Sequence, residues 1–212
     1  MEHYASDEEQ VEAIKTWLKA NGGAIVTGLI VGLAVIFGWQ YWNSYQISKA
    51  EQASIRFDAL SQAIANDDMD AAKQYGQDLL NDDPDSSYAA IAALMLAKLA
   101  AKEGNNDKAA EHIQWVLEHA EQAELKTIAR LRLVRILIAE GRLDDAETQL
   151  TEINNTHFSA EQQELRGDIY LARNDLAQAR NAYQAARAVL ANSDSATLLD
   201  IKLDNLAIAG QE

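Results

Sequence analysis

The sequence predicts an all-α protein: a single transmembrane helix followed by a solenoid of degenerate helical hairpins. Three observations support this prediction. Residues 22–42 form an apolar run without a charged side chain. The remainder is rich in Ala, Leu, Asp, Glu and Gln, and the chain has one proline, Pro84, a composition that favours helix over strand. A polar-turn motif also returns every 33 to 37 residues, which is typical of stacked helical hairpins.

Residues 1–21 are predicted to form a polar tail that contains a short amphipathic helix. In "SDEEQVEAIKTWLKANGG", Ser6 and Glu9 have the spacing of a capping box. The apolar residues that share one helical face are Val11, Ile14, Trp17 and Leu18. Gly22 would suit the C-terminal cap of this helix. The helix would lie on a membrane surface, and a frayed acidic tail is the alternative.

Residues 22–42 are predicted to be a permanent membrane anchor. As a helix, this run would be about 32 Å long, which is enough to cross the hydrocarbon core. A secretion signal is less consistent with its length, with the acidic tail before it, and with the absence of small residues at a cleavage position after it. Aromatic residues typical of a membrane interface cluster at its C-terminal edge: Trp39, Tyr41, Trp42 and Tyr45.

The orientation of the anchor follows weakly from its flanking charges. Lys15 and Lys19 precede the run, whereas Lys49 and Arg56 follow it. The preceding lysines lie nearer the membrane than Arg56 does, which slightly favours a cytoplasmic N-terminus. Charge alone leaves the opposite orientation open.

Small residues recur along one face of the anchor. Ala24, Gly28 and Gly32 are four residues apart, and such a face lets another membrane helix approach closely. The partner would be a helix of another protein or of a second copy. Glycine is also common in membrane helices that have no partner, so both interpretations stay open.

Residues 43–66 are predicted to continue as a juxtamembrane helix into a repeat domain at 67–212. Their apolar stripe is Ala53, Phe57, Leu60 and Ile64. Within the domain, an alanine starts the second helix of each hairpin; these alanines are Ala72, Ala109, Ala146 and Ala179. The number of repeats, three or four, is open because the first copy is faint.

The last repeat has the clearest pattern. Gly167 and Tyr170 precede Ala179, Tyr183 and Ala186, and this spacing resembles the tetratricopeptide repeat. The other copies depart from it, with Ala97 and Val134 where that repeat has glycine. The final stretch "SATLLDIKLDNLAIAG" is predicted to cap the stack.

The composition offers little chemistry. A net charge of −15 repels phosphate backbones, so nucleic acid is not an expected partner. Without cysteine there is no disulfide, thiol nucleophile or zinc–thiolate site. His112 and His119 are seven residues apart and are better read as surface residues than as metal ligands. No catalytic motif is present, so we expect no enzyme, cofactor or metal.

The whole chain resembles the ancillary subunits of the SecYEG translocon, the YfgM family of Gram-negative bacteria. The run "VEAIKTWLKANGGAIVTGLIVGLAVIFGWQYW" carries most of this resemblance. The resemblance implies a single-pass inner-membrane protein with a cytoplasmic N-terminus and a periplasmic repeat domain. It also implies two partners, the SecYEG channel and PpiD, a membrane-anchored periplasmic chaperone of the peptidyl-prolyl isomerase type. It implies no catalytic residues.

The tetratricopeptide pattern places the first helix of each hairpin on a binding groove. The residues on this face are Ile91, Leu94 and Lys98, then Ile128, Leu131, Arg135 and Ile138, and finally Glu161, Glu164, Asp168 and Leu171. This groove would change from apolar with basic points to acidic, and the acidic end would select a basic segment. The alternative is that its apolar members belong to the core.

The predicted function is therefore that of a non-enzymatic adaptor at the translocon that links it to periplasmic chaperones and assists exported polypeptides. A scaffold for another cell-envelope complex is the alternative within binding proteins. An enzyme with an unrecognised site is the less favoured class.

Overall fold

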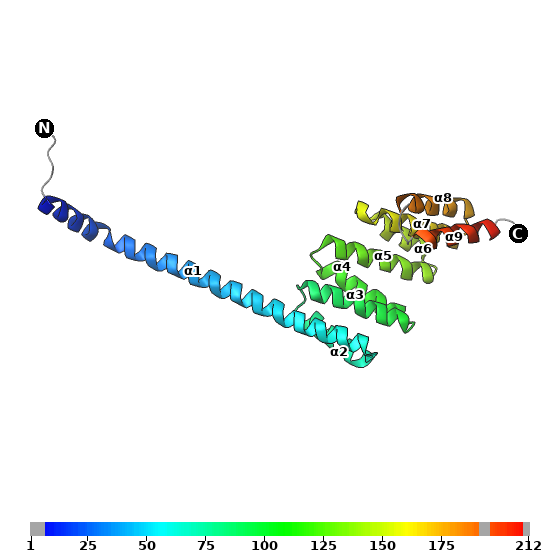
Figure 1. Cartoon of the computed structure of the whole chain (residues 1–212), viewed down its shortest axis with the longest axis horizontal. Coiled ribbons are helices and arrows are strands. Elements are labelled where there is room, and N and C mark those ends of the chain that lie inside the picture. Colours follow the sequence, from blue (N-terminus) through cyan, green and yellow to red (C-terminus); the bar gives the residue numbers. More distant parts are fainter. Residues whose placement is uncertain (1–6, 191–195, 210–212) are drawn as a thin grey trace, which may run out of the picture. The chain divides into compact units, whose positions relative to one another are not determined.

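The computed structural model describes residues 7–190 and 196–209, and this part of the chain is helical with no strand (Figure 1). The helices are α1 (Asp7–Ala65), α2 (Met69–Asp82), α3 (Ser87–Lys102), α4 (Asn106–His119), α5 (Ala123–Ala139), α6 (Leu143–Thr151), the short 3-10 helix η1 (Thr156–Phe158), α7 (Ser159–Ala172), α8 (Leu176–Val189) and α9 (Ala196–Ala209). The chain divides into two compact units, residues 1–51 and 52–212.

In the described part of the first unit, residues 7–51 form one uninterrupted helix, the N-terminal part of α1. Gly22 does not cap a shorter helix as predicted, because α1 continues through Gly22 and Gly23. No proline stops it, and an apolar segment favours an unbroken helix in which every backbone group is bonded. The one polar side chain of the run follows the same rule, since the Thr27 hydroxyl donates to the Gly23 carbonyl at 2.9 Å.

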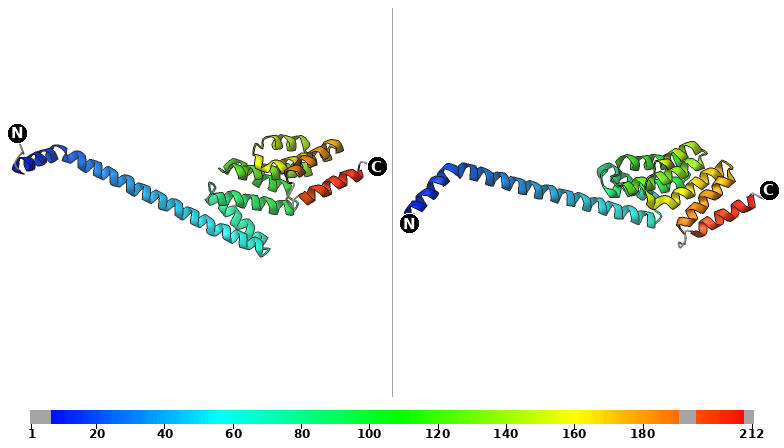
Figure 2. Two further views of the ribbon diagram at one scale, coloured as in Figure 1. Left: turned by 45° about the horizontal axis from the view of Figure 1, so that its top comes forward. Right: turned by 90° about the horizontal axis from the view of Figure 1, so that it is seen from above.

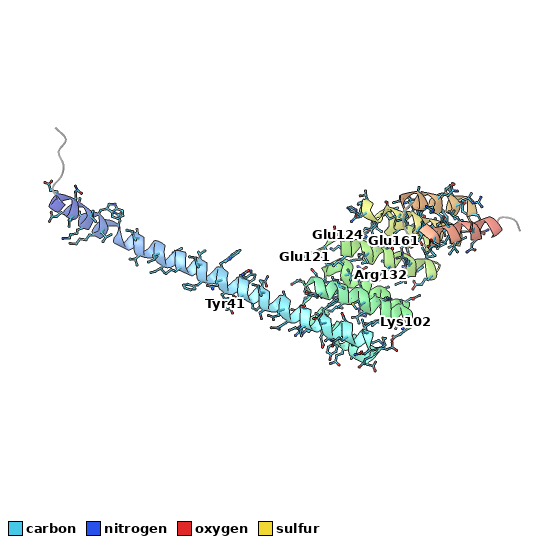
Figure 3. All side chains as sticks on the ribbon, viewed as in Figure 1. Tyr41, Lys102, Glu121, Glu124, Arg132 and Glu161 are labelled. Carbon is cyan, nitrogen blue, oxygen red and sulfur yellow. The ribbon has the colours of Figure 1, made fainter. Side chains whose placement is uncertain are left out.

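The apolar side chains of this unit point outward. Within the described residues, α1 is the one helix long and apolar enough to cross a membrane, with a mean hydropathy of 2.0 over its most apolar window. Tyr41 projects freely from it (Figure 3). Exposed apolar surface of this extent suits a lipid environment.

The second unit is a stack of antiparallel helical hairpins (Figure 2). The described residues form four of them. In the first, the end of α1 and α2 share a buried apolar cluster and the ion pair between Arg56 and Asp82. The others are α3 with α4, α5 with α6, and α7 with α8. Each second helix packs on the first helix of the next hairpin, and α9 packs on α8. The predicted solenoid with a terminal capping helix is therefore confirmed.

The polar turns between paired helices serve as caps. The side-chain oxygens of Asp68, Asn105 and Asp175 each accept a hydrogen bond from the backbone N–H three residues later. Each of these turns, and the corresponding one before α6, contains a residue with positive φ. These residues are Asp67, Gly104, Gly141 and Asn174. The repeated sequence motif is thus a helix stop followed by a helix start.

The four aligned alanines all lie where two helices meet. Ala72, Ala109, Ala146 and Ala179 are each 0% exposed. Their small side chains let the paired helices approach closely. The alignment drawn from the sequence therefore selects equivalent positions of the fold.

The departures from the tetratricopeptide pattern compensate one another in volume. Twelve residues before and four residues after each aligned alanine, two buried positions recur in every hairpin. These pairs are Leu60 and Gly76, Ala97 and Ile113, Val134 and Leu150, and Gly167 and Tyr183. In three of the pairs one member is large and the other is small, and Val134 with Leu150 is the exception. Gly167 directly faces the Tyr183 ring, the largest of these side chains. Degeneracy of the sequence thus coexists with a filled core.

Candidate functional site

The first helices of the second and third hairpins border an open depression, here called the α3–α5 groove. Its volume is about 360 Å³. It is lined by Ala97, Lys98 and Ala101 of α3, Ile113 of α4, and Arg132, Arg135 and Ile136 of α5. The depression therefore has an apolar base and three basic side chains.

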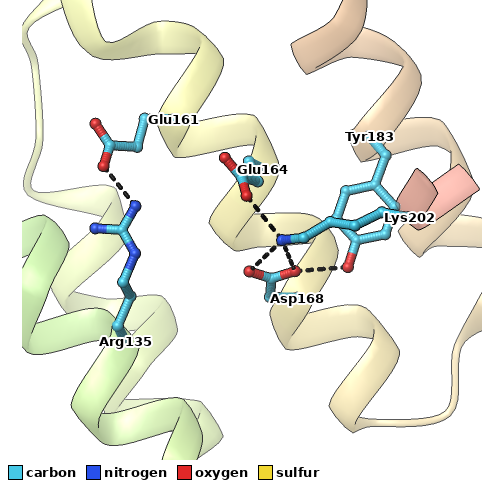
Figure 4. Close-up of polar contacts among 6 residues, drawn as sticks. All are labelled: Arg135, Glu161, Glu164, Asp168, Tyr183 and Lys202. Atoms are coloured by element: carbon cyan, nitrogen blue, oxygen red, sulfur yellow. Dashed lines mark hydrogen bonds and ion pairs between the residues drawn. The ribbon is translucent and has the colours of Figure 1, made fainter. Parts of the chain in front are cut away.

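The three basic side chains differ in how they are held. Lys98 is exposed. Arg132 is partly buried, and its Nη1 donates to the Leu94 carbonyl at 2.8 Å. Burial, followed by the positive charge of Arg135, lowers the pKa of Arg132, although a guanidinium keeps its proton in proteins. Arg135 is exposed and pairs with Glu161 of α7 at 2.5 Å (Figure 4).

Two apolar residues predicted for the groove are core residues instead. Leu94 is 4% exposed and Leu131 is 1% exposed. Leu94 packs in the core cluster that joins α3 to its neighbouring helices, and Leu131 packs in the cluster of α5, α6 and α7. Lys98 and Arg135, one turn further along the same helices, are exposed.

The other predicted apolar residues are more accessible. Ile91, Ile128 and Ile138 are partly buried, and the last two pack against core clusters. Leu171 of α7 is 43% exposed. The structure therefore separates the predicted groove into core positions and a smaller accessible set.

The acidic end of the predicted groove holds a side chain of the protein itself. Lys202 of α9 places its Nζ 2.8 Å from Oε1 of Glu164 and 2.7 Å from Oδ1 of Asp168 (Figure 4). The Tyr183 hydroxyl donates to the same Asp168 oxygen at 2.6 Å. The prediction that this end is open to an external basic segment is corrected, because Lys202 occupies the two carboxylates.

The pKa shifts in this cluster favour the protonated forms of Lys202 and Tyr183, which are the forms that donate to the carboxylates. Burial lowers the pKa of Lys202, but its hydrogen bonds to Asp168 and Glu164 outweigh burial and the net shift is upward. Burial, followed by the hydrogen bond to Asp168, raises the pKa of Tyr183, which keeps its hydroxyl as a donor. The sequence analysis did not identify Lys202, because its partners Glu164 and Asp168 lie 38 and 34 residues away and no local pattern links them.

The similarity of this chain to known proteins extends over both units. A family model described as a tetratricopeptide repeat-like domain matches residues 15–208, from before the apolar run to the last helix. The protein named "Ancillary SecYEG translocon subunit" in Escherichia coli strain K12 is 30% identical over 211 residues, covering 98% of this chain and 100% of the relative. The chain belongs to this family of ancillary SecYEG translocon subunits.

Proteins of the same name in other bacteria also match this chain over most of its length. The one from Haemophilus influenzae is 29% identical over 88% of this chain and 91% of its own. The one from Neisseria gonorrhoeae is 24% identical over 97% of this chain and 100% of its own. The resemblance drawn from the sequence is thereby confirmed, and it extends over the anchor as well as the hairpins.

No cluster suited to metal binding is found among the described residues of this family member. His119 stacks on Trp115 with ring centroids 4.4 Å apart, and its Nδ1 lies 2.9 Å from the Trp115 carbonyl. His112 is buried instead, and burial lowers its pKa. His119 therefore contacts an aromatic ring on an exposed part of α4, whereas His112 lies in the protein interior.

The small-residue face of the anchor is open. A Cβ added at Gly28 or Gly32 would meet no atom within 4 Å, and Ala24 beside them is exposed. This face has room for a helix of another molecule. Its occupation by a partner stays a prediction.

Proposed function

We propose that this protein is a non-enzymatic, membrane-anchored adaptor that associates with the SecYEG translocon. The observation that carries the proposal is the extent of the family match, which includes the apolar part of α1 together with all the hairpins. The relatives that match over this length are named as translocon subunits. An anchor and a repeat surface in one chain suit a protein that holds other polypeptides at a membrane channel.

We further propose that the repeat domain lies in the periplasm and links the translocon to PpiD, and that it assists exported polypeptides. The family resemblance supports this orientation, and the lysines before the span favour it weakly. The protein would then be a single-pass protein of the bacterial inner membrane. A reporter that is active only in the periplasm, fused after Glu212, should be active. Activity of a cytoplasmic reporter alone would reverse the orientation.

The association itself is tested by recovering the full chain from gently solubilised membranes and identifying its partners by mass spectrometry. SecYEG and the chaperone should be enriched. A matched control replaces residues 22–42 by an unrelated single span, which keeps the repeat domain at the membrane. If the native span carries translocon contacts, this control should recover less SecYEG while retaining the chaperone.

Two results would overturn the proposal. Recovery of neither SecYEG nor a chaperone would remove its basis. Enrichment of a different envelope complex, such as one for wall synthesis, would assign the adaptor to that complex instead.

A further inference from the structure

We infer that the α3–α5 groove is a docking site for a short polypeptide segment that combines acidic and aliphatic side chains. This inference rests on the proposed function in one respect, that the repeat domain binds polypeptide. It adds the chemical character of the segment and the residues that would hold it.

The α3–α5 groove is basic, although the protein as a whole is acidic. The protein has a net charge of −15, yet the groove is lined by three basic side chains and by no acidic one. Within the described residues, Lys98 forms no ion pair and Arg132 donates to a carbonyl rather than to a carboxylate. Only Arg135 has a carboxylate partner, Glu161. The groove thus keeps positive charge that a carboxylate of a ligand would compensate.

The last three hairpins carry a charged residue at one equivalent position. Eleven residues before the aligned alanines, the same position of the first helix carries Lys98, Arg135 and Asp168. At Asp168 this position already holds a charged side chain from another helix, since Lys202 of α9 lies 2.7 Å away. The molecule therefore shows in its last hairpin how a helical segment docks on this face through a side chain of opposite charge. In the two preceding hairpins the sign is reversed, so the matching segment is acidic.

The base of the groove is apolar. Ala97 and Ala101 present small side chains on α3, and Ile113 and Ile136 complete the floor. Aliphatic side chains of a ligand would contact this floor while its carboxylates reach the basic rim, which is the usual division between the core and rim of an interface. A nucleic acid fits less well, because a protein with a net charge of −15 repels a chain of evenly spaced phosphates.

The test uses the full chain in detergent micelles and three fluorescein-labelled ten-residue peptides. One alternates leucine with aspartate, one leucine with asparagine and one leucine with lysine. Fluorescence anisotropy should show tighter binding of the aspartate peptide than of the other two by about tenfold or more. Raising the ionic strength from about 0.05 to about 0.5 M should weaken that binding.

The variants locate the site. Lys98→Gln removes an exposed charge that forms no ion pair among the described residues, so folding should be unaffected. It should weaken aspartate-peptide binding by about twofold to fivefold. Adding Arg135→Gln should weaken it further. The control, Lys108→Gln, removes the same charge from α4 outside the groove lining and should leave binding unchanged.

Three results would overturn the inference: equal affinity for the aspartate and asparagine peptides, equal effects of the Lys98 and Lys108 variants, or competition by phosphatidylglycerol vesicles but not by unlabelled aspartate peptide. The last result would make the groove a lipid-headgroup site. Loss of peptide binding alongside normal recovery of SecYEG would reject the groove alone. Peptide binding without any recovery of SecYEG would reject the proposed function and leave the groove.

Discussion

Replacing Gly167 by alanine is expected to destabilise the repeat domain, although alanine is the better helix former. Gly167 lies within α7 and faces the ring of Tyr183 on α8. A Cβ at Gly167 would lie 2.4 Å from both Cδ1 and Cε1 of that ring. The ring has no room to move away, because Tyr183 is 0% exposed and its hydroxyl is bonded to Asp168.

The sign of the effect follows from two opposing terms. Alanine in a helix interior is favoured over glycine by about 1 kcal/mol. Overpacking a core typically costs about 1–3 kcal/mol and occasionally more, and a contact this short with a rigid ring belongs at the upper end. The net loss is therefore about 2 kcal/mol. For a chain of this size, that corresponds to a fall in Tm of about 4–8 °C.

The assay is thermal unfolding of the full chain in detergent, followed by circular dichroism. Gly76→Ala is the matched control, because its Cβ would meet Cδ1, Cδ2 and Cγ of the aliphatic Leu96 side chain at 2.8–2.9 Å, which is less close than the contact with the Tyr183 ring. The control should change Tm much less than Gly167→Ala does. In a Tyr183→Leu background, Gly167→Ala should lose most of its cost, as a double-mutant cycle would show. A Tm for Gly167→Ala equal to or above that of the wild type would refute the close approach of α7 and α8.

Three further predictions concern other parts of the chain. Lys202→Met should leave the carboxylates of Glu164 and Asp168 without their lysine partner and should loosen α9. Hydrogen exchange should then become faster in α9 and α7 alone. Unchanged exchange would mean that the cluster does not hold the helix. Burial lowers the folded-state pKa of His112 below its ordinary value. The unfolded chain therefore binds more protons, and the free energy of unfolding should fall as pH drops below about 6.5. In urea titrations, His112→Gln should flatten this pH dependence, and an unaltered pH dependence would assign the effect to other groups. Replacing Gly28 and Gly32 together by leucine should preserve membrane insertion and reduce co-purification of partners; full recovery would show that the face is unoccupied.

Local patterns in the sequence were sufficient for the general architecture. A charge-free run long enough to span a membrane needs no tertiary information to be identified, because its surface is compatible with lipid whatever follows it. The repeated polar turns predicted the hairpins for a similar reason. A side-chain cap and a residue with positive φ act within a few residues of Asp68, Asn105 and Asp175.

The expected end of the first helix at Gly22 shows the limit of such local signals. Glycine permits a helix to end but does not force it to. In the structure the backbone hydrogen bonding continues through Gly22 into the apolar run. The requirement that an apolar segment bond its own backbone outweighs a single weak stop signal.

The sequence by itself determined the helical-hairpin domain and the apolar helix long enough to span a membrane that the described residues show. Helix propensity, apolar length and turn chemistry are short-range properties. Only the tertiary structure decided which part of the predicted groove is accessible. Lys202 reaches Glu164 and Asp168 across 38 and 34 residues of sequence, and no local pattern encodes that contact. The burial of Leu94 and Leu131 likewise depends on neighbouring helices that cover them. Periodicity specifies the face on which a residue lies, whereas packing between distant segments decides whether that face is open.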